Sequence, residues 1–336
     1  MLKPKKTVKK CLSWLLALVM ILSVIPVAVL AAPADLSISS AKELLAFSEK
    51  VNGGEDFSGK TVELTADIDL GGEGSEWTPI GSSSSAFVGT FDGNNHVISG
   101  LYISSGSNAG LFGKVNGGTV KNVTVKGSVS GSSSVAGVVG YLNAGNIIGC
   151  GNNADVSGSS GVGGVVGYVG GASTVSGCYN SGNVSGTTGY IGGVSGQHWR
   201  AGKLENCYNT GNVTSGKTGE RIWVGAAAGE LIQVQPVTNL YYLDGTSEKG
   251  IGDVISVDKN VAEAKTEKQL KAPALRTALG EAFKRDLGKI NNGYPVLTWQ
   301  ISEGPDEPEI PETDAYTISA SKNSEITLGE DAEVTL

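Results

Sequence analysis

The chain has 336 residues, of which 50 are glycine, 17% are charged and only 6% are aromatic. It has no G-x-y period and 40% of its residues are hydrophobic, so collagen and a wholly disordered chain are excluded. Acidic residues outnumber basic ones by 33 to 25, and five lysines lie in the first ten residues; the rest is therefore acidic, which excludes nucleic acid and anionic lipid as expected partners.

Residues 1–34 are predicted to be a secretory signal peptide. The lysines precede an apolar run from Leu12 to Ala32, and small residues follow it. The alternative is an uncleaved membrane anchor, because the run is long enough to span a bilayer. Pro26 breaks the run near its end and favours cleavage. We therefore expect a secreted or cell-surface protein that meets a membrane only during export.

Residues 35–58 are predicted to form an N-terminal capping helix. Ser40 and Glu43 have the spacing of a capping box, and Gly53 ends the amphipathic run that follows. Such a helix would cover the exposed sheet edges at the start of a coil.

Residues 59–245 carry an internal repeat that determines the predicted fold. A G-[LV]-x-G tetrapeptide begins at positions spaced by 27, 27 and 29 residues, namely Gly110, Gly137, Gly164 and Gly193. A fifth, degenerate unit follows from Gly225 to Tyr242. Each unit holds three short apolar pieces separated by turn formers, which suits strands and is too short for helices. Three strands per turn, stacked on the next unit, predict an all-β fold: a single-stranded parallel β-helix, or solenoid.

The C-terminal part is predicted to contain three further segments. Residues 246–301 form a C-terminal cap, because Thr266 to Gln269 opens a second helical pattern. Residues 302–314 alternate acid and proline and form an extended linker. Residues 315–336 begin a β-sandwich module, immunoglobulin-like or cohesin-like, that is too short to be complete.

The order of several blocks resembles that of a known group of proteins. The blocks are VNGG, ELTADIDLGG, EWTPIG, FVGTFDGNNHVISGLYI, AGLFG, ENCYNTGNV and GEAFKRDLGKINNGYPVLTWQ. Together they resemble the GLUG-repeat surface proteins of clostridia and related anaerobes, over roughly residues 35 to 300. The same repeat is known in non-catalytic regions of streptococcal immunoglobulin A peptidases. The resemblance implies a secreted, wall-associated or modular protein with a β-helical region. It implies no known catalytic site.

The cysteines and histidines suggest structure rather than metal chemistry. Three cysteines follow the repeat at the position of Val123, and zinc would want close C-x-x-C pairs instead of whole-turn spacings. A metal set and a disulfide with one free thiol stay open, but a buried apolar ladder is favoured, formed by Cys150, Cys178 and Cys207. His96 and His198 form no metal motif, and we expect both to face solvent or pack under a cap. No cofactor is predicted.

A polysaccharide lyase or glycoside hydrolase is the main enzymatic alternative, since such enzymes use acid pairs on β-helices. Acids are available, but none repeats as a pair at the spacing of a turn: Asp67, Asp69, Asp92, Asp155, Glu205, Glu220 and Glu230. We therefore predict no catalytic residues, while an accessory region of a larger secreted protease remains a further alternative.

A ligand site is predicted where the period lengthens in the last two units. Inserted residues in a solenoid emerge as loops, often on the binding face. The candidates are Trp199, Arg200, Arg221 and Trp223, because tryptophan suits sugar rings and arginine suits carboxylates. The alternative is that both tryptophans pack beneath the C-terminal cap. The sequence thus predicts a non-catalytic rigid stalk or adhesin with extracellular or cell-surface glycans or proteins as partners.

Overall fold

The computed structural model describes residues 33–200, 202–217, 221–258, 261–287 and 289–301. The predicted linker and C-terminal module lie outside these residues, as does nearly all of the predicted signal peptide. Those three assignments therefore stay predictions.

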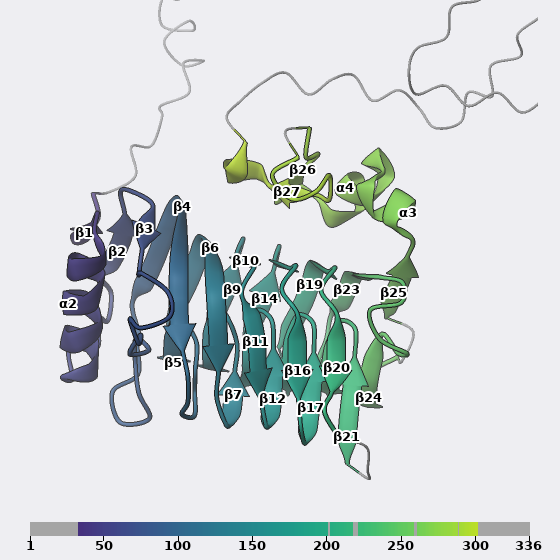
Figure 1. Ribbon diagram of the computed structural model, residues 1–336, viewed down its shortest axis with the longest axis horizontal. Coiled ribbons are helices and arrows are strands. Elements are labelled where there is room, and N and C mark those ends of the chain that lie inside the picture. The colour runs from purple at the N-terminus through teal and green to yellow at the C-terminus, as the bar shows by residue number, and fades with distance from the viewer. Residues whose placement is uncertain (1–32, 201, 218–220, 259–260, 288, 302–336) are drawn as a thin grey trace, which may run out of the picture.

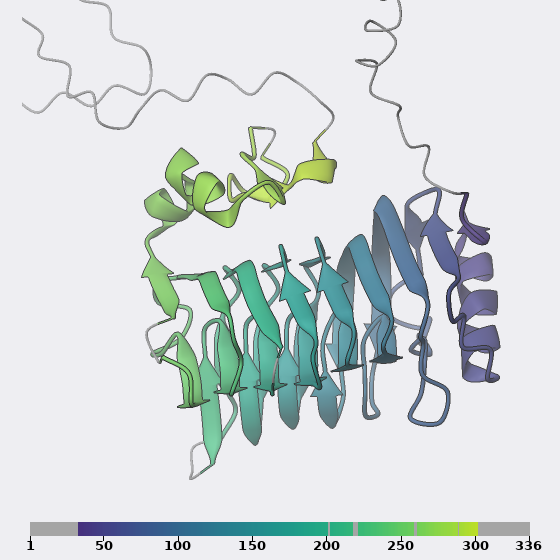
Figure 2. The same ribbon diagram turned by 180° about the vertical axis from the view of Figure 1, so that it is seen from behind.

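Three parallel sheets form the sides of one coil (Figures 1 and 2). A four-stranded sheet holds β7 (Ser133–Val135), β12 (Ser160–Gly163), β17 (Gly189–Gly192) and β21 (Ile222–Gly225). A six-stranded sheet holds β5 (Phe112–Asn116), β8 (Val139–Asn143), β13 (Val166–Gly170), β18 (Ser195–Trp199), β22 (Ala228–Ile232) and β24 (Ile251–Ile255). A fifteen-stranded sheet holds β1 (Leu36–Ile38), β2 (Thr61–Leu64), β3 (Ile68–Asp69), β4 (Thr90–Ile103), β6 (Thr119–Ser130), β9 (Asn146–Ile148), β10 (Gly151–Asn152), β11 (Asp155–Gly158), β14 (Thr174–Ser176), β15 (Tyr179–Asn180), β16 (Val184–Gly186), β19 (Lys203–Asn209), β20 (Val213–Ser215), β23 (Val237–Leu243) and β25 (Ala262–Lys265).

The predicted parallel β-helix is confirmed. The coil has about six turns of about 28 residues, and its strands pair in parallel with their equivalents one turn later. Val156 pairs with Val184, and Val166 with Val139, so the repeat positions read from the sequence are also the structural register. Because equivalent residues stack, each interior position forms a column of similar side chains along the coil.

The last glycine of each tetrapeptide allows two sheets to touch. A Cβ atom on Gly196 would lie 2.5 Å from the carbonyl oxygen of Gly167 and 2.6 Å from the amide nitrogen of Val162. One turn earlier, a Cβ on Gly167 would lie 2.5 Å from the amide nitrogen of Val135. The six-stranded and four-stranded sheets therefore approach so closely that a side chain has no room.

An asparagine ladder runs through the coil interior and was missed in the sequence. The side chains of Asn152, Asn180 and Asn209 are fully buried, and the amide nitrogens of Asn152 and Asn180 each donate to the next side-chain oxygen at 2.7 Å. Each also donates to the carbonyl oxygen two residues on, which satisfies the buried amides. The signal was present, since an asparagine follows each ladder cysteine by two positions.

Helix α2 (Ala41–Asn52) covers the N-terminal end of the coil, as predicted (Figure 1). The Ser40 hydroxyl accepts a hydrogen bond from the Glu43 amide, and the Glu43 carboxylate accepts one from the Ser39 amide at 2.7 Å. The helix buries Phe47, whose ring packs edge-on against Phe57 and Phe87 inside the first turns. This apolar contact closes the coil at its start.

The C-terminal segment, residues 266–301, differs from the prediction in its place. It contains α3 (Glu267–Lys271), α4 (Pro273–Leu279), β26 (Phe283–Lys284), β27 (Val296–Leu297) and the 3-10 helix η1 (Thr298–Gln300). The coil itself continues past Gly245, because β24 and β25 pair with β22 and β23. The helical pattern predicted from Thr266 is present and begins with a capping box, but the segment folds back along the side of the coil and does not cover its end (Figures 1 and 2).

A tyrosine ladder explains this placement. Tyr179 and Tyr208, which follow Cys178 and Cys207, lie on the outer side of the fifteen-stranded sheet, and their rings stack at 5.6 Å. Tyr241 continues the column one turn on. The ladder is covered by apolar residues of the C-terminal segment, namely Leu270, Leu275, Leu279, Phe283 and Leu297. The helical pattern that we expected to cap the end therefore buries the outer side of the sheet.

Replacing Tyr208 by Phe is expected to lower the free energy of unfolding by about 1–3 kcal/mol. The Tyr208 hydroxyl accepts a hydrogen bond from the Asn291 amide at 2.8 Å and donates one to the Pro295 carbonyl, both buried. Urea denaturation measures the change, with Tyr102→Phe in β4 as the control. Equal stability of wild type and Tyr208→Phe would contradict this role.

Candidate functional site

The three cysteines occupy one interior column. Cys150, Cys178 and Cys207 are fully buried free thiols, and Leu240 pairs with Cys207 in the next turn. Burial raises the pKa of the Cys150 and Cys207 thiols. Among the residues that the structure describes, no group of three or more His, Cys, Asp or Glu is arranged to hold a metal ion. The cysteines thus lie as the apolar ladder would require.

The two histidines lie in different surroundings. His96 is half-buried with its Nδ1 atom 3.0 Å from an Asp67 carboxylate oxygen. His198 is fully buried in the coil between Val169 and Leu231, and neither ring nitrogen has a hydrogen-bond partner. This corrects the expectation that His198 faces solvent or a cap. Burial alone lowers the pKa of His198 to about 3, so the ring is neutral.

The predicted ligand residues form two pairs on two sheets. Trp199 ends β18 with 38% of its surface exposed, and the Arg200 guanidinium lies over its ring, 4.5 Å from the centroid. Arg221 precedes β21, where Trp223 stacks on Tyr190 with the ring centroids 5.0 Å apart. Neither tryptophan packs under the C-terminal segment, because that segment lies on the fifteen-stranded sheet.

A column of polar and aromatic side chains runs between these pairs on the outer face of the six-stranded sheet. Its members pair in register in the order Lys114, Tyr141, Tyr168, Gln197, Glu230 and Asp253. The Tyr141 and Tyr168 rings stack at 4.8 Å. One turn later, the Gln197 amide donates a hydrogen bond of 2.6 Å to the Glu230 carboxylate.

The column joins the two tryptophan–arginine pairs into one surface. Burial raises the pKa of the Tyr168 hydroxyl, nearby Tyr141 raises it further, and Arg200 lowers it, so Arg200 lies near this ring. Burial raises the pKa of the Tyr190 hydroxyl, the nearby Glu230 carboxylate raises it further, and Arg221 lowers it. We call this surface the Glu230 face and define it as Tyr168, Tyr190, Gln197, Glu230 and Asp253.

Glu230 is the unusual group of this face. It is only 4% exposed, and burial raises the pKa of its carboxyl while the nearby Asp253 carboxylate raises it further. Glu230 and Asp253 do not follow the repeat period of 27–29 residues, because the final turn of the coil is shorter. The sequence signal was Gly229-Glu230-Leu231 followed by Gly252-Asp253-Val254.

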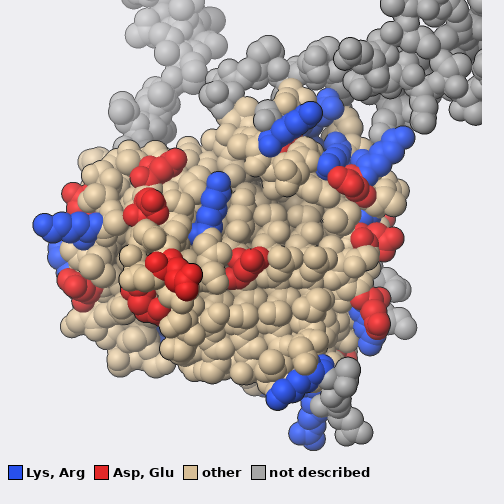
Figure 3. Space-filling model, in the orientation of Figure 1, with Lys and Arg blue, Asp and Glu red and all other residues tan. Residues whose placement is uncertain are grey.

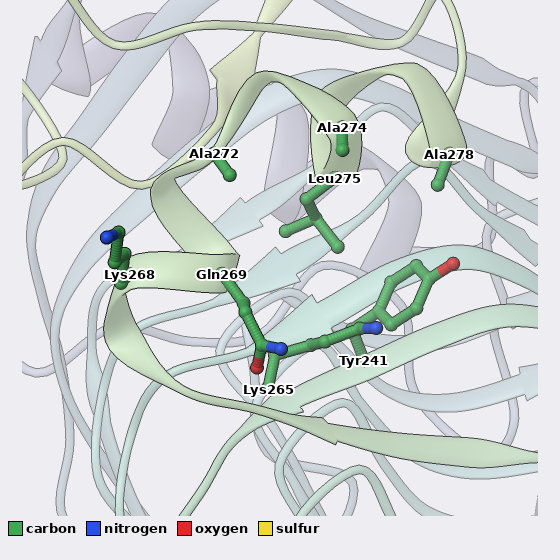
Figure 4. A pocket seen from close by; sticks show the side chains of 8 residues that line it. All are labelled: Tyr241, Lys265, Lys268, Gln269, Ala272, Ala274, Leu275 and Ala278. Atoms are coloured by element: carbon green, nitrogen blue, oxygen red, sulfur yellow. The ribbon is translucent and has the colours of Figure 1, made fainter. Parts of the chain in front are cut away.

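A cavity of about 420 Å³ lies between the helices α3 and α4 and the strands β23 and β25 of the fifteen-stranded sheet (Figure 4). Tyr241 forms one wall, and Leu275 with three alanines forms much of the apolar lining. Lys265 lies at this cavity but pairs with Glu263 at 2.6 Å. The cavity exists because the C-terminal segment folds back, which the sequence pattern did not indicate.

On one face of the described part of the chain, the acidic side chains lie in several separate places. On the face shown in Figure 3, acidic and basic side chains are interspersed among larger uncharged areas. Asp92 pairs with Lys121 at 2.9 Å, which accounts for one of the acids considered above. Within the described ranges, no helix is long and apolar enough to cross a membrane.

Comparison with known proteins supports the repeat assignment. The GLUG motif matches residues 187–214, which include one tetrapeptide and the Trp199–Arg200 pair. A "Putative Gly-rich membrane protein" of Evansella cellulosilytica is 39% identical over 69 residues, which is 20% of this chain and 8% of that protein. This chain therefore matches only a small part of that relative.

A solved structure has a similar fold. It is described as a "putative immunoglobulin A1 protease from Bacteroides ovatus", and it matches with a TM-score of 0.57 and 21% identity. The match covers 80% of this chain and 92% of the other. At this identity the likeness concerns the fold alone. The motif, the repeat and the coil together show that the chain carries a GLUG-motif β-helix module.

Proposed function

We propose that the chain is a non-catalytic adhesive module of a secreted or cell-surface protein. Its rigid coil is attached near its early turns, so that the far end of the coil is free. The observation that carries this proposal is the return of the C-terminal segment. The Trp299 indole donates to the Gly149 carbonyl at 3.3 Å, and the Gln300 amide lies 3.5 Å from the Thr124 hydroxyl.

This return supports display rather than spacing. Ile301 lines a cavity together with Asn95 and Asn122, so the described chain ends beside the early turns of the coil. A linear stalk would carry its two connections at opposite ends. The stacked ladders make the coil stiff, because each turn hydrogen-bonds along its length to the next. A stiff body attached from one side presents its faces and its far end to a partner.

Adhesion to glycans is tested with the whole chain on a glycan array and on cells. Trp199→Ala is expected to weaken binding with little change in melting temperature, because Trp199 is exposed. Trp223→Ala is expected to weaken binding and also to lower stability by roughly 1 kcal/mol, because its stacking on Tyr190 is lost. A purely structural role predicts lower stability with adhesion unchanged. Absence of adhesion by the wild type would reject the proposal.

The non-catalytic part has its own test. Glycoside hydrolases use a pair of carboxylic side chains. Glu230 and Asp253, which lie one turn apart, form such a pair and are therefore the residues to test. Purified chain is expected to release no product from pectin, other uronates or neutral polysaccharides. Turnover that Glu230→Gln abolishes would instead establish the enzymatic alternative.

A further inference from the structure

We infer that the Glu230 face is a binding site for a neutral oligosaccharide. The inference deepens the proposed adhesive function and rests on it for the general class of ligand. The residues of the face, and the exclusion of acidic sugars, come from the geometry of the six-stranded sheet.

The aromatic groups offer two walls. The tyrosine stack that begins at Tyr141 ends at Tyr168, because the next position in the column holds Gln197. In the part of the chain that the structure describes, no further ring stacks on Tyr168. The Tyr190–Trp223 stack lies on the neighbouring sheet. Aromatic rings that keep a free face or edge on the outside of a protein suit the apolar faces of sugar rings.

The polar groups between these walls are chiefly hydrogen-bond acceptors. One Glu230 oxygen accepts from Gln197, and one Asp253 oxygen accepts from the Val254 amide at 2.9 Å. Ionised carboxylates accept several hydrogen bonds each, so the half-buried Asp253 keeps capacity for donors from a ligand, whereas Glu230 is almost fully covered. Sugar hydroxyls are such donors, and hydrogen bonds to charged acceptors are stronger than neutral ones.

The same carboxylates exclude an acidic sugar. Glu230 and Asp253 occupy opposed positions on β22 and β24, so a uronate bound between the walls would meet two negative charges at close range. The nearest arginine on this sheet, Arg200, has its guanidinium stacked over Trp199 at the rim. The centre of the face is therefore acidic and its cations are peripheral.

A structural role alone does not explain Glu230. Glutamine at this position would keep the hydrogen bond with Gln197 and would avoid placing a carboxylate where it is almost fully covered. A carboxylate that is almost fully covered, in register with the Tyr141–Tyr168 stack and next to Asp253, points to a functional role.

The test measures binding of the full chain by calorimetry to cellohexaose, mannohexaose, chitohexaose and hexagalacturonate. At least one neutral probe is expected to bind, and hexagalacturonate is not. Glu230→Gln and Tyr168→Ala are each expected to weaken that binding about tenfold. Tyr168→Phe is expected to retain it, because the ring remains. Glu205→Gln in β19, on another sheet, is the matched control for charge and should bind as the wild type does.

The outcomes separate this inference from the proposed function. Neutral binding that is unchanged in folded Glu230→Gln and Tyr168→Ala would move the site elsewhere and leave the adhesive function standing. Binding of hexagalacturonate alone would overturn the neutral class. Adhesion to cells without binding to any of the four probes would overturn this inference only, whereas loss of both would overturn the two together.

Discussion

Acidification from pH 7 to pH 3 is expected to lower the free energy of unfolding by about 4 kcal/mol through His198 alone. Its pKa in the folded protein is about 3, whereas an unfolded histidine titrates near its ordinary pKa of 6.5. The unfolded state therefore binds the proton first as the pH falls. The contribution of His198 is fully present above pH 6.5 and is lost progressively towards pH 3.

His198→Leu is expected to remove this loss and to stabilise the chain by about 1–3 kcal/mol at pH 7. Both ring nitrogens lack partners, and the neighbours in the column, Val169 and Leu231, are aliphatic. Urea denaturation at several pH values measures both effects. Since carboxylates also titrate in this range, the quantity compared is the difference between variant and wild type.

His96→Gln serves as the control, because His96 lies near the surface beside Asp67. This variant should change the free energy of unfolding at pH 7 by less than about 1 kcal/mol, because a contact of this kind near the surface contributes little. Parallel pH profiles of His198→Leu and wild type would show that His198 does not govern acid stability.

Gly196→Ala is expected to destabilise the chain by roughly 3 kcal/mol or more. The added Cβ would lie within 2.6 Å of three backbone atoms, those of Gly167, Gly161 and Val162. Backbone held in ladders on both sides cannot move away as a flexible side chain can. The substitution would force apart the six-stranded and four-stranded sheets at the turn that carries the GLUG motif.

Gly216→Ala is the matched control for this effect. A Cβ there would lie 3.7 Å from the nearest atom, a methyl of Thr187, which is an ordinary contact. We expect its stability to change by less than about 1 kcal/mol. Thermal unfolding followed by circular dichroism compares the two. Equal melting temperatures for both variants would show that the sheets do not depend on close approach at Gly196.

The sequence determined the repeat-based features of this protein. Equivalent positions such as Val156 and Val184 share a register because stacked parallel strands must repeat at the period of the chain. The helix starts at Ser40 and Thr266 were also predictable, since each depends on hydrogen bonds within four residues. Local spacing was sufficient in these cases because the partners are near neighbours or exact repeats.

Only the tertiary structure decided where the C-terminal segment lies and which residues form the Glu230 face. The apolar pattern of the segment suits any apolar surface, and the rings of Tyr179 and Tyr208 on the outer side of the fifteen-stranded sheet provide one along the side of the coil. Glu230 and Asp253 pair on adjacent strands because the last turn is shorter than the others, which a fixed repeat period does not predict. Both outcomes depend on packing between distant segments. The free energy of such packing is set by the surface that the two segments bury together, and neither segment's sequence shows it alone.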